Sequence, residues 1–377
     1  MTKSQRKMYI FLFVLTVVTT LGFQGWRILI NNFAVEIVKI NGQEMGLLQS
    51  IREVPGFLAL LVIYLLFIFT EHRLAALSVI ILGIGVGLTG FFPCFLGLVF
   101  CTLLMSFGFH YYETLNQSLT LQYFDLKQAP LVMGKLKGLA ALVNIITGVI
   151  VFGLAFWLNY KQMFLVLGGL TVLGGLWALV QDPSDKQLPP QHKKMILRKK
   201  YWLFYVLTLF AGARRQIFVA FAVFLLVKKF HYSILEISVL FVVNNVLNYY
   251  FSPILGKAIN RFGERWILSL EYFSLIFIFL VYAFGENKWL IGIMYILDHI
   301  FFNFAIAIRS FFQKIADPKD IAPSMAVGFT INHIIAVIVP VVGGVLWMYD
   351  YRIPFIGGAI FSFISLCFVQ LIKYKGE

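Results

Sequence analysis

The sequence predicts an all-α membrane protein made of two pseudo-symmetric bundles of six transmembrane helices. Hydrophobic residues fill 60% of the 377 positions and charged residues only 13%, about half the charge of a typical soluble domain. Long apolar segments are separated by short charged connections, and the period-2 alternation of a membrane β-barrel is absent. We therefore expect helices, which satisfy their own backbone groups in lipid.

Twelve segments, taken with their flanks, approach the roughly 20 residues that cross a bilayer as a helix. The predicted spans cover residues 8–36, 45–70, 73–92, 94–124, 130–158, 161–180, 201–227, 233–257, 265–285, 288–314, 320–348 and 353–373. An even number of spans places both termini on the same side of the membrane.

Basic residues indicate which side that is. Lysines and arginines concentrate on the terminal side, and the opposite side carries only Lys39, Lys161, Lys228, Lys229, Lys288 and Arg352. The positive-inside rule then places both termini in the cytoplasm, and we expect the inner membrane of a bacterium. The same orientation, with attraction to anionic membrane lipid, explains the net charge of +14, so no nucleic-acid partner is expected.

The longest polar stretch, residues 181–200, divides the chain into two halves. It contains three prolines and a basic cluster at residues 193–200, which is typical of a linker held at the lipid surface. We expect an N-terminal bundle at residues 1–180, a cytoplasmic linker at 181–200 and a C-terminal bundle at 201–377.

The halves carry similar sequences after their fourth spans. Residues 125–130 read Asp-Leu-Lys-Gln-Ala-Pro, and residues 317–323 read Asp-Pro-Lys-Asp-Ile-Ala-Pro. Asn144 and Asn332 follow in the corresponding next spans. A repeat of whole helical bundles is the usual plan of secondary transporters.

The connection between the eighth and ninth spans carries glycines and charged residues at fixed spacing, namely Gly256, Asn260, Arg261, Gly263 and Arg265. It resembles the loop motif of the major facilitator superfamily, in which glycine and three residues precede an aspartate, a basic residue, any residue, a glycine and two basic residues. Asn260 replaces the aspartate, and Glu264 replaces a base. The resemblance implies a secondary transporter that works by alternating access, with these residues at an inner gate.

Charges at membrane depth fall in a subset of the spans. Spans three, six and twelve have no charged residue between their ends, and span nine has only Glu271. In the resembling family the third helix of each triplet is outer scaffold, and the other helices line the cavity. The distribution of charge in this sequence follows the same division.

Arginines outnumber acids among the charges expected to line the cavity, with Arg27, Arg52, Arg214, Arg215 and Arg309 against Glu53, Glu113 and Asp298. Each charge costs on the order of 2.5 to 3.5 kcal/mol near the bilayer centre. An excess of guanidinium groups favours a small organic anion or zwitterion as substrate. The predicted substrate-binding residues are Arg27, Arg52, Arg214, Arg215, Asn244, Asn248 and Asn332.

The acids are the predicted proton carriers, because a carboxylate that alternately meets water and an arginine can take up and release a proton. Glu113 is the first choice, since His110 lies one turn earlier on the same face, and Asp298 and Glu53 follow. His110 and His333 are further candidates. The alternative is that these charges form salt bridges that lock helices together, with polar residues serving as packing contacts.

We expect a monomeric, proton-coupled secondary transporter. The alternatives are an uncoupled facilitator or lipid flippase, and a membrane receptor that does not transport. Cys94, Cys101 and Cys367 lack the spacing of a metal site, and no nucleophile and base pair is visible. No cofactor, metal or enzymatic activity is therefore expected.

Overall fold

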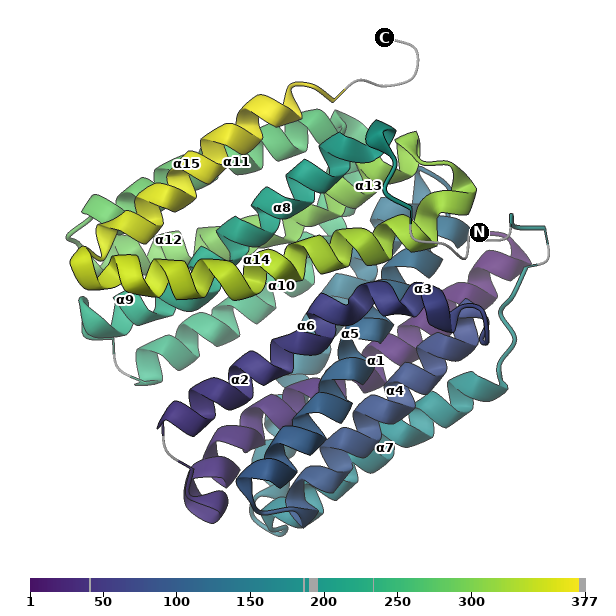
Figure 1. Ribbon diagram of the computed structural model, residues 1–377, viewed down its shortest axis with the longest axis horizontal. Coiled ribbons are helices and arrows are strands. Elements are labelled where there is room, and N and C mark those ends of the chain that lie inside the picture. Colours follow the sequence, from purple (N-terminus) through teal and green to yellow (C-terminus); the bar gives the residue numbers. More distant parts are fainter. Residues whose placement is uncertain (41, 186, 190–195, 233, 373–377) are drawn as a thin grey trace. The chain divides into compact units, whose positions relative to one another are not determined.

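The computed structural model describes residues 1–40, 42–185, 187–189, 196–232 and 234–372, and every regular element in them is helical (Figure 1). Twelve helices in this part of the chain are long and apolar enough to cross a membrane. The predicted all-α fold of twelve spans is confirmed.

Unbroken helices form spans three to six, eight, nine, eleven and twelve. They are α4 (Glu71–Leu88), α5 (Phe95–Tyr123), α6 (Gln128–Leu154), α7 (Tyr160–Val180), α10 (Ile234–Phe262), α11 (Glu264–Phe284), α14 (Ile321–Tyr349) and α15 (Arg352–Val369). Two short 3₁₀ segments adjoin them, η3 (Thr89–Phe91) after α4 and η7 (Pro318–Asp320) before α14, and a third, η4 (Lys199–Tyr201), precedes span seven.

The other four spans change helix type along their length. Span one is α1 (Lys3–Asn32) followed by the π-helical η1 (Phe33–Val38), and span two is α2 (Gly42–Phe57), the 3₁₀ segment η2 (Leu58–Leu61) and α3 (Val62–Leu65). Span seven is α8 (Trp202–Ile217), the π-helical η5 (Phe218–Ala222) and α9 (Val223–Lys228). Span ten is α12 (Lys288–Phe301), the 3₁₀ segment η6 (Phe302–Phe304) and α13 (Ala305–Ile315).

Side-chain caps fix several helix starts. Thr2 and Gln5 form a reciprocal capping box at α1, and Asn159 and Gln162 form another at α7. Asn287 accepts a hydrogen bond from the backbone of α12. These side chains bond backbone N–H groups that the first helical turn leaves without a partner.

The chain forms two compact units. One unit contains Met1–Phe124, Leu139–Ile196 and Pro318–Thr330, and the other contains Asp125–Gly138, Leu197–Asp317 and Ile331–Glu377. Helices α6 and α14 therefore each contribute their first part to one unit and the remainder to the other. The division into residues 1–180, 181–200 and 201–377 stays a prediction, and residues 186 and 190–195 of the linker lie outside the described residues.

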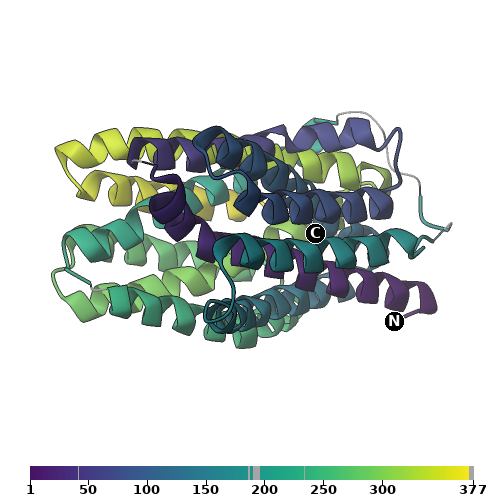
Figure 2. The same ribbon diagram turned by 90° about the horizontal axis from the view of Figure 1, so that it is seen from below.

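In the first unit, α1, α4, α5 and α7 run side by side (Figures 1 and 2). Small residues allow this, because a Cβ on Gly83 of α4 would lie 2.8 Å from the carbonyl oxygen of Gly168 on α7. These two glycine-rich helices are therefore in close backbone contact. Trp26, Phe164 and Leu82 are fully buried in the core of this unit.

In the second unit, α8, α11, α12 and α15 enclose a core that contains Phe279, Tyr282 and Phe355. Helix α10 packs on the first part of α6, where a Cβ on Gly256 would lie 2.5 Å from the carbonyl oxygen of Pro130. Glycine is required at this position because any side chain would collide with the α6 backbone. The tight contact fixes the end of α10 that carries the glycine motif.

Candidate functional site

Arg52 and Glu53, consecutive on α2, form an ion pair in the first unit. Arg52 Nη2 lies 2.7 Å from Glu53 Oε1, and both side chains are 24% exposed. Ser106 of α5 donates its hydroxyl to the carbonyl oxygen of Arg52. Both charges therefore lie together at a partly exposed position, and a hydroxyl from a second helix holds the α2 backbone beside them.

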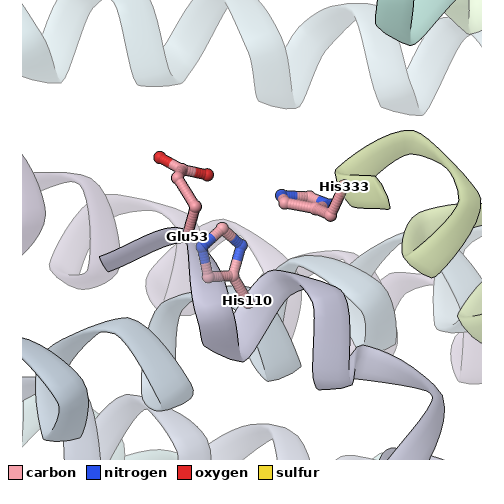
Figure 3. A group of neighbouring side chains, drawn as sticks. All are labelled: Glu53, His110 and His333. Carbon is pink, nitrogen blue, oxygen red and sulfur yellow. The ribbon is translucent and has the colours of Figure 1, made fainter. Parts of the chain in front are cut away.

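His110 of α5 lies next to this ion pair. A carboxylate oxygen of Glu53 and a ring nitrogen of His110 are within 4.8 Å of each other (Figure 3). Glu113, one turn later on α5, is partly buried, and its Oε2 lies 3.5 Å from Nε2 of Gln117. His333, the third side chain drawn in Figure 3, is buried on α14 and belongs to the second unit.

Arg27 on α1 is exposed. Its guanidinium carbon lies 5.9 Å from the centre of the Phe23 ring. Phe23 in turn stacks on Phe109 of α5, with ring centroids 4.0 Å apart. The cation thus lies near an aromatic pair that joins α1 to α5, at the outer limit of a cation–π contact.

A buried cluster of charges lies in the second unit, around Arg214 of α8. We call it the acid cluster, and it comprises Arg214, Glu271, Tyr272, Tyr282, Asp298 and Ser365. Arg214 Nη2 lies 3.7 Å from Glu271 Oε1, and its Nη1 donates to the hydroxyl of Ser365. Asp298 on α12 is close enough to Arg214 and Glu271 to interact with both charges.

Aromatic rings wall the acid cluster. The Arg214 guanidinium carbon lies 4.2 Å from the centre of the Tyr272 ring, and both Tyr272 and Tyr282 are fully buried. Arg214, Glu271 and Asp298 are 3%, 5% and 4% exposed. One guanidinium and two carboxyl groups from three helices are therefore held away from the surface.

A second cluster in the same unit is basic and aromatic. We call it the basic cluster, and it comprises Lys137, Arg215, Asn248, His299, Phe302 and Asn303. Lys137 Nζ of α6 and the guanidinium carbon of Arg215 each lie 5.7 Å from the centre of the Phe302 ring. Phe302 also stacks on His299. Two cations thus converge on one ring that is half-buried in the unit.

Amides and an imidazole line the same region. Asn248 Nδ2 and His299 Nε2 are 2.8 Å apart, and Asn303 Nδ2 donates to Asn248 Oδ1 over 2.6 Å. The chain of hydrogen bonds joins α10, α12 and η6. It fixes the side chains beside Phe302 and leaves polar groups near both cations.

The remaining predicted asparagines of the second unit are more isolated. Asn244, one turn before Asn248, is buried, and neither its Oδ1 nor its Nδ2 has a hydrogen-bond partner in the described structure. Asn332 of α14 packs against Gly212 of α8, where an added Cβ would lie 2.8 Å from Asn332 Nδ2. Arg309 is partly buried on α13.

The predicted gating residues lie on helix ends more than on a loop. Helix α10 continues through Gly256, Asn260 and Arg261 and ends before Gly263, whose φ of 79° suits glycine. Asn260 Nδ2 donates to the carbonyl oxygen of Lys127 over 2.6 Å. Arg265 is exposed and bonds Gln370 over 3.2 Å.

The substituted base of the motif has a partner of opposite charge. Glu264 is fully buried, and its two carboxylate oxygens accept hydrogen bonds from Ser310 and Lys314, each over 2.7 Å. A base at this position would face Lys314. The acid that replaces the family's basic residue at position 264 is therefore paired with a lysine of α13.

Sequence reasoning missed Lys137 and Glu271 as site residues. Lys137 lies within the predicted span 130–158, but the predicted substrate-binding residues were arginines and asparagines alone. Glu271 was assigned to scaffold as the only charge of span nine. The signal was present in both cases, because a charge well inside an apolar span is costly unless it is paired or functional.

A sequence profile described as Major Facilitator Superfamily matches residues 5–339. No curated protein matches the sequence significantly.

Solved transporter structures share the fold. The human organic anion transporter MFSD10 (TETRAN) aligns with a TM-score of 0.74 at 13% identity, over 98% of this chain and 100% of that one. A variant of the Escherichia coli fucose:proton symporter FucP aligns with a TM-score of 0.75 at 12% identity, over 98% of this chain and 100% of that one. A bacterial homologue of the iron transporter ferroportin, in an outward-facing state, aligns with a TM-score of 0.77 at 12% identity, over 96% of this chain and 98% of that one. Identities this low show similarity of fold.

Proposed function

The chain belongs to the major facilitator superfamily and has its transporter fold, and we propose that it moves a small organic anion or zwitterion by proton-coupled alternating access. It acts as a monomer in the inner membrane of a bacterium, with both termini in the cytoplasm. The positive-inside distribution of lysine and arginine supports this orientation.

The observation that carries the substrate class is the basic cluster. Lys137 and Arg215 lie at equal distance, 5.7 Å, from the ring of Phe302. A guanidinium fork matches a carboxylate or phosphate, and a lysine adds a compact second charge. Phe302 offers apolar surface to the body of the same solute. An organic anion would use all three groups.

The polar groups beside Phe302 suit this role. Asn248 and Asn303 carry amides that both donate and accept, and His299 adds an imidazole. A small number of polar groups that fix orientation within an aromatic wall is typical of a binding site for a small molecule. Asn244, one turn before Asn248 on α10, and Asn332 of α14 remain candidate contacts in the same unit. Arg27 and Arg52 remain predicted substrate-binding residues of the first unit.

Proton coupling is supported by the number of acids at membrane depth. Glu53, Glu113 and Asp298 lie within predicted spans. The side chains of His110 on α5 and His333 on α14 are buried. FucP, a structural relative of the same fold, is described as a proton symporter. Intramembrane carboxyl groups of this kind carry protons in many pumps and transporters.

Thermal unfolding of the full-length protein in detergent tests the substrate class. The panel contains succinate, benzoate and glucose 6-phosphate as anions, alanine as a zwitterion and choline as a cation. An anion at 100 times its Kd should stabilise the native protein by about 2.7 kcal/mol. Stabilisation should be lost in Arg215→Gln and in Lys137→Gln.

Lys135→Gln is the matched control, because Lys135 is exposed two residues away on the same helix. This variant should keep the full response to the anion. Stabilisation by choline alone would reverse the roles of the arginines and acids. A wild-type protein that responds to no compound of the panel but is stabilised by phospholipid would favour the lipid flippase.

A further inference from the structure

Buried polar atoms without a hydrogen-bond partner gather in the acid cluster. In the described structure they include Nε and Nη2 of Arg214, Oε2 of Glu271 and Oδ2 of Asp298, while the hydroxyls of Tyr272 and Tyr282 lie near Arg214 and Asp298 without good hydrogen-bond geometry. Native structures leave few such atoms, and each requires an explanation. Four of them on three charged side chains indicate a site that can bind and release a small species such as a proton.

The number of charges identifies what is exchanged. Arg214 carries one positive charge, and Glu271 and Asp298 together carry two negative charges when both are ionised. An unbalanced charge is unfavourable in a site with aromatic walls and almost no exposure. One bound proton makes the group neutral. A metal cation would instead be repelled by Arg214.

A static salt bridge does not explain the arrangement. Arg214 and Glu271 are 3.7 Å apart, and neither Nη2 of Arg214 nor Oε2 of Glu271 has a hydrogen-bond partner in the described residues. A pair that served only to hold helices together would be expected to satisfy these atoms. The second carboxyl, Asp298, would also be superfluous.

We propose that Arg214, Glu271 and Asp298 form the proton-binding site of the transporter, with one proton shared by the two carboxyl groups while Arg214 stays charged. The role in transport rests on the function proposed above. The proton enters from water, occupies a carboxylate oxygen of Glu271 or Asp298, and leaves to water later in the cycle. Glu271 thereby becomes a proton-carrying residue on α11, a helix that its sequence assigned to scaffold.

No other charged group is recorded next to these carboxyls in the described structure. Tyr272 and Tyr282 face them from α11. Tyr295 of α12 lies near Tyr282, and α15 contributes the Ser365 hydroxyl. The Glu264–Lys314 pair lies seven residues before Glu271, about 10 Å along α11. The three charges of the cluster therefore determine its protonation.

Consecutive residues connect this site to the basic cluster. Arg214 is followed by Arg215 on α8, and Asp298 is followed by His299 on α12. Adjacent residues of a helix point about 100° apart, so two faces of the same two helices serve the two clusters. A small rotation of α8 or α12 on proton binding would move the groups around Phe302.

Helix irregularities occur next to both connections. The π-helical η5 begins three residues after Arg215, and the 3₁₀ segment η6 begins three residues after His299. Such segments mark places where a helix changes its hydrogen-bonding pattern, and they are frequent at functional sites. They give α8 and α12 a way to adjust without breaking.

Infrared spectroscopy of the full-length protein in lipid, across a pH titration, tests the proton site. The wild type should show the carbonyl stretch of a protonated carboxylic acid at neutral pH. Glu271→Gln and Asp298→Asn should each lose this band, because the remaining carboxylate then balances Arg214. Arg214→Gln should increase the band, because both acids become protonated.

Glu286→Gln is the matched control, since Glu286 is exposed just after the end of α11. It should leave the band unchanged. A wild type without the band, or a band that persists in both Glu271→Gln and Asp298→Asn, would overturn the proposal. If Arg214→Gln does not fold, the two acid variants still decide. The measurement uses no substrate, so failure of the proposed anion specificity would leave its outcome intact.

Discussion

The ion pair of Arg52 with Glu53 and the cluster of Arg214 with Glu271 and Asp298 place the same chemical groups in different surroundings. Arg52 and Glu53 are neighbours on one helix, balance one to one, and are each 24% exposed. Arg214 faces acids from two other helices and is 3% exposed. A balanced and partly hydrated pair can stay ionised, whereas a buried and unbalanced group must bind a proton.

The largest difference in stability between the two regions is expected when the arginine of each is removed. Arg214→Gln should destabilise the protein by about 3 to 5 kcal/mol, because the buried carboxyl groups lose their cation and the native state must then take up a further proton to neutralise them. Arg52→Gln should cost about 1 kcal/mol or less, since water can solvate the partly exposed carboxylate of Glu53. Thermal unfolding in the same detergent measures both losses. Equal losses would mean that exposure and charge balance do not distinguish the two regions.

A double variant in the acid cluster measures how strongly Arg214 and Glu271 interact. Adding Glu271→Gln to Arg214→Gln should recover part of the lost stability, because the second change removes an acid that no longer has a cation. Contacting charged residues couple by about 0.5 to 3 kcal/mol. Unfolding of the two single variants and the double variant gives this coupling. Additive losses would show that Arg214 and Glu271 do not interact.

A smaller effect is expected at the glycine motif of α10. Asn260→Asp restores the residue usual in the family but replaces the amide that donates to the Lys127 carbonyl oxygen. A carboxylate cannot donate, so the contact between α10 and the start of α6 should weaken by about 0.5 to 1.5 kcal/mol. Asn260→Ala, which removes the donor without adding charge, is the comparison variant. A gain of stability in Asn260→Asp would refute this role for the amide.

The sequence was sufficient to predict the helices, because hydropathy and span length follow directly from the bilayer. The predicted end of span eight at residue 257 was too early, since α10 continues to Phe262. Asn260 and Arg261 look like loop residues in a hydropathy profile, yet a polar residue at the membrane edge can continue a helix into water. Gly263, with its positive φ, marks the true end.

The partners of the charged residues could not be predicted. If the charges served only to lock helices together, Arg52 would pair with an acid of another helix, but the structure pairs it with its own neighbour, Glu53. Adjacent arginines at 214 and 215 indicated function, but only the packing of α8 against α11, α12 and α15 shows that they belong to different clusters. Contacts between distant helices depend on rotation about each helix axis, which an apolar sequence on all sides does not specify.

The most direct test of proton-coupled anion binding is to mix the protein, in weakly buffered detergent, with the anion of the panel that stabilises it and to record pH with an indicator dye. Coupling between two sites is reciprocal, so anion binding should change the number of protons bound. The wild type should show a pH change that saturates with anion, and Glu271→Gln should bind the anion with no pH change. Saturable anion binding by the wild type at constant pH would contradict the coupling of the two clusters.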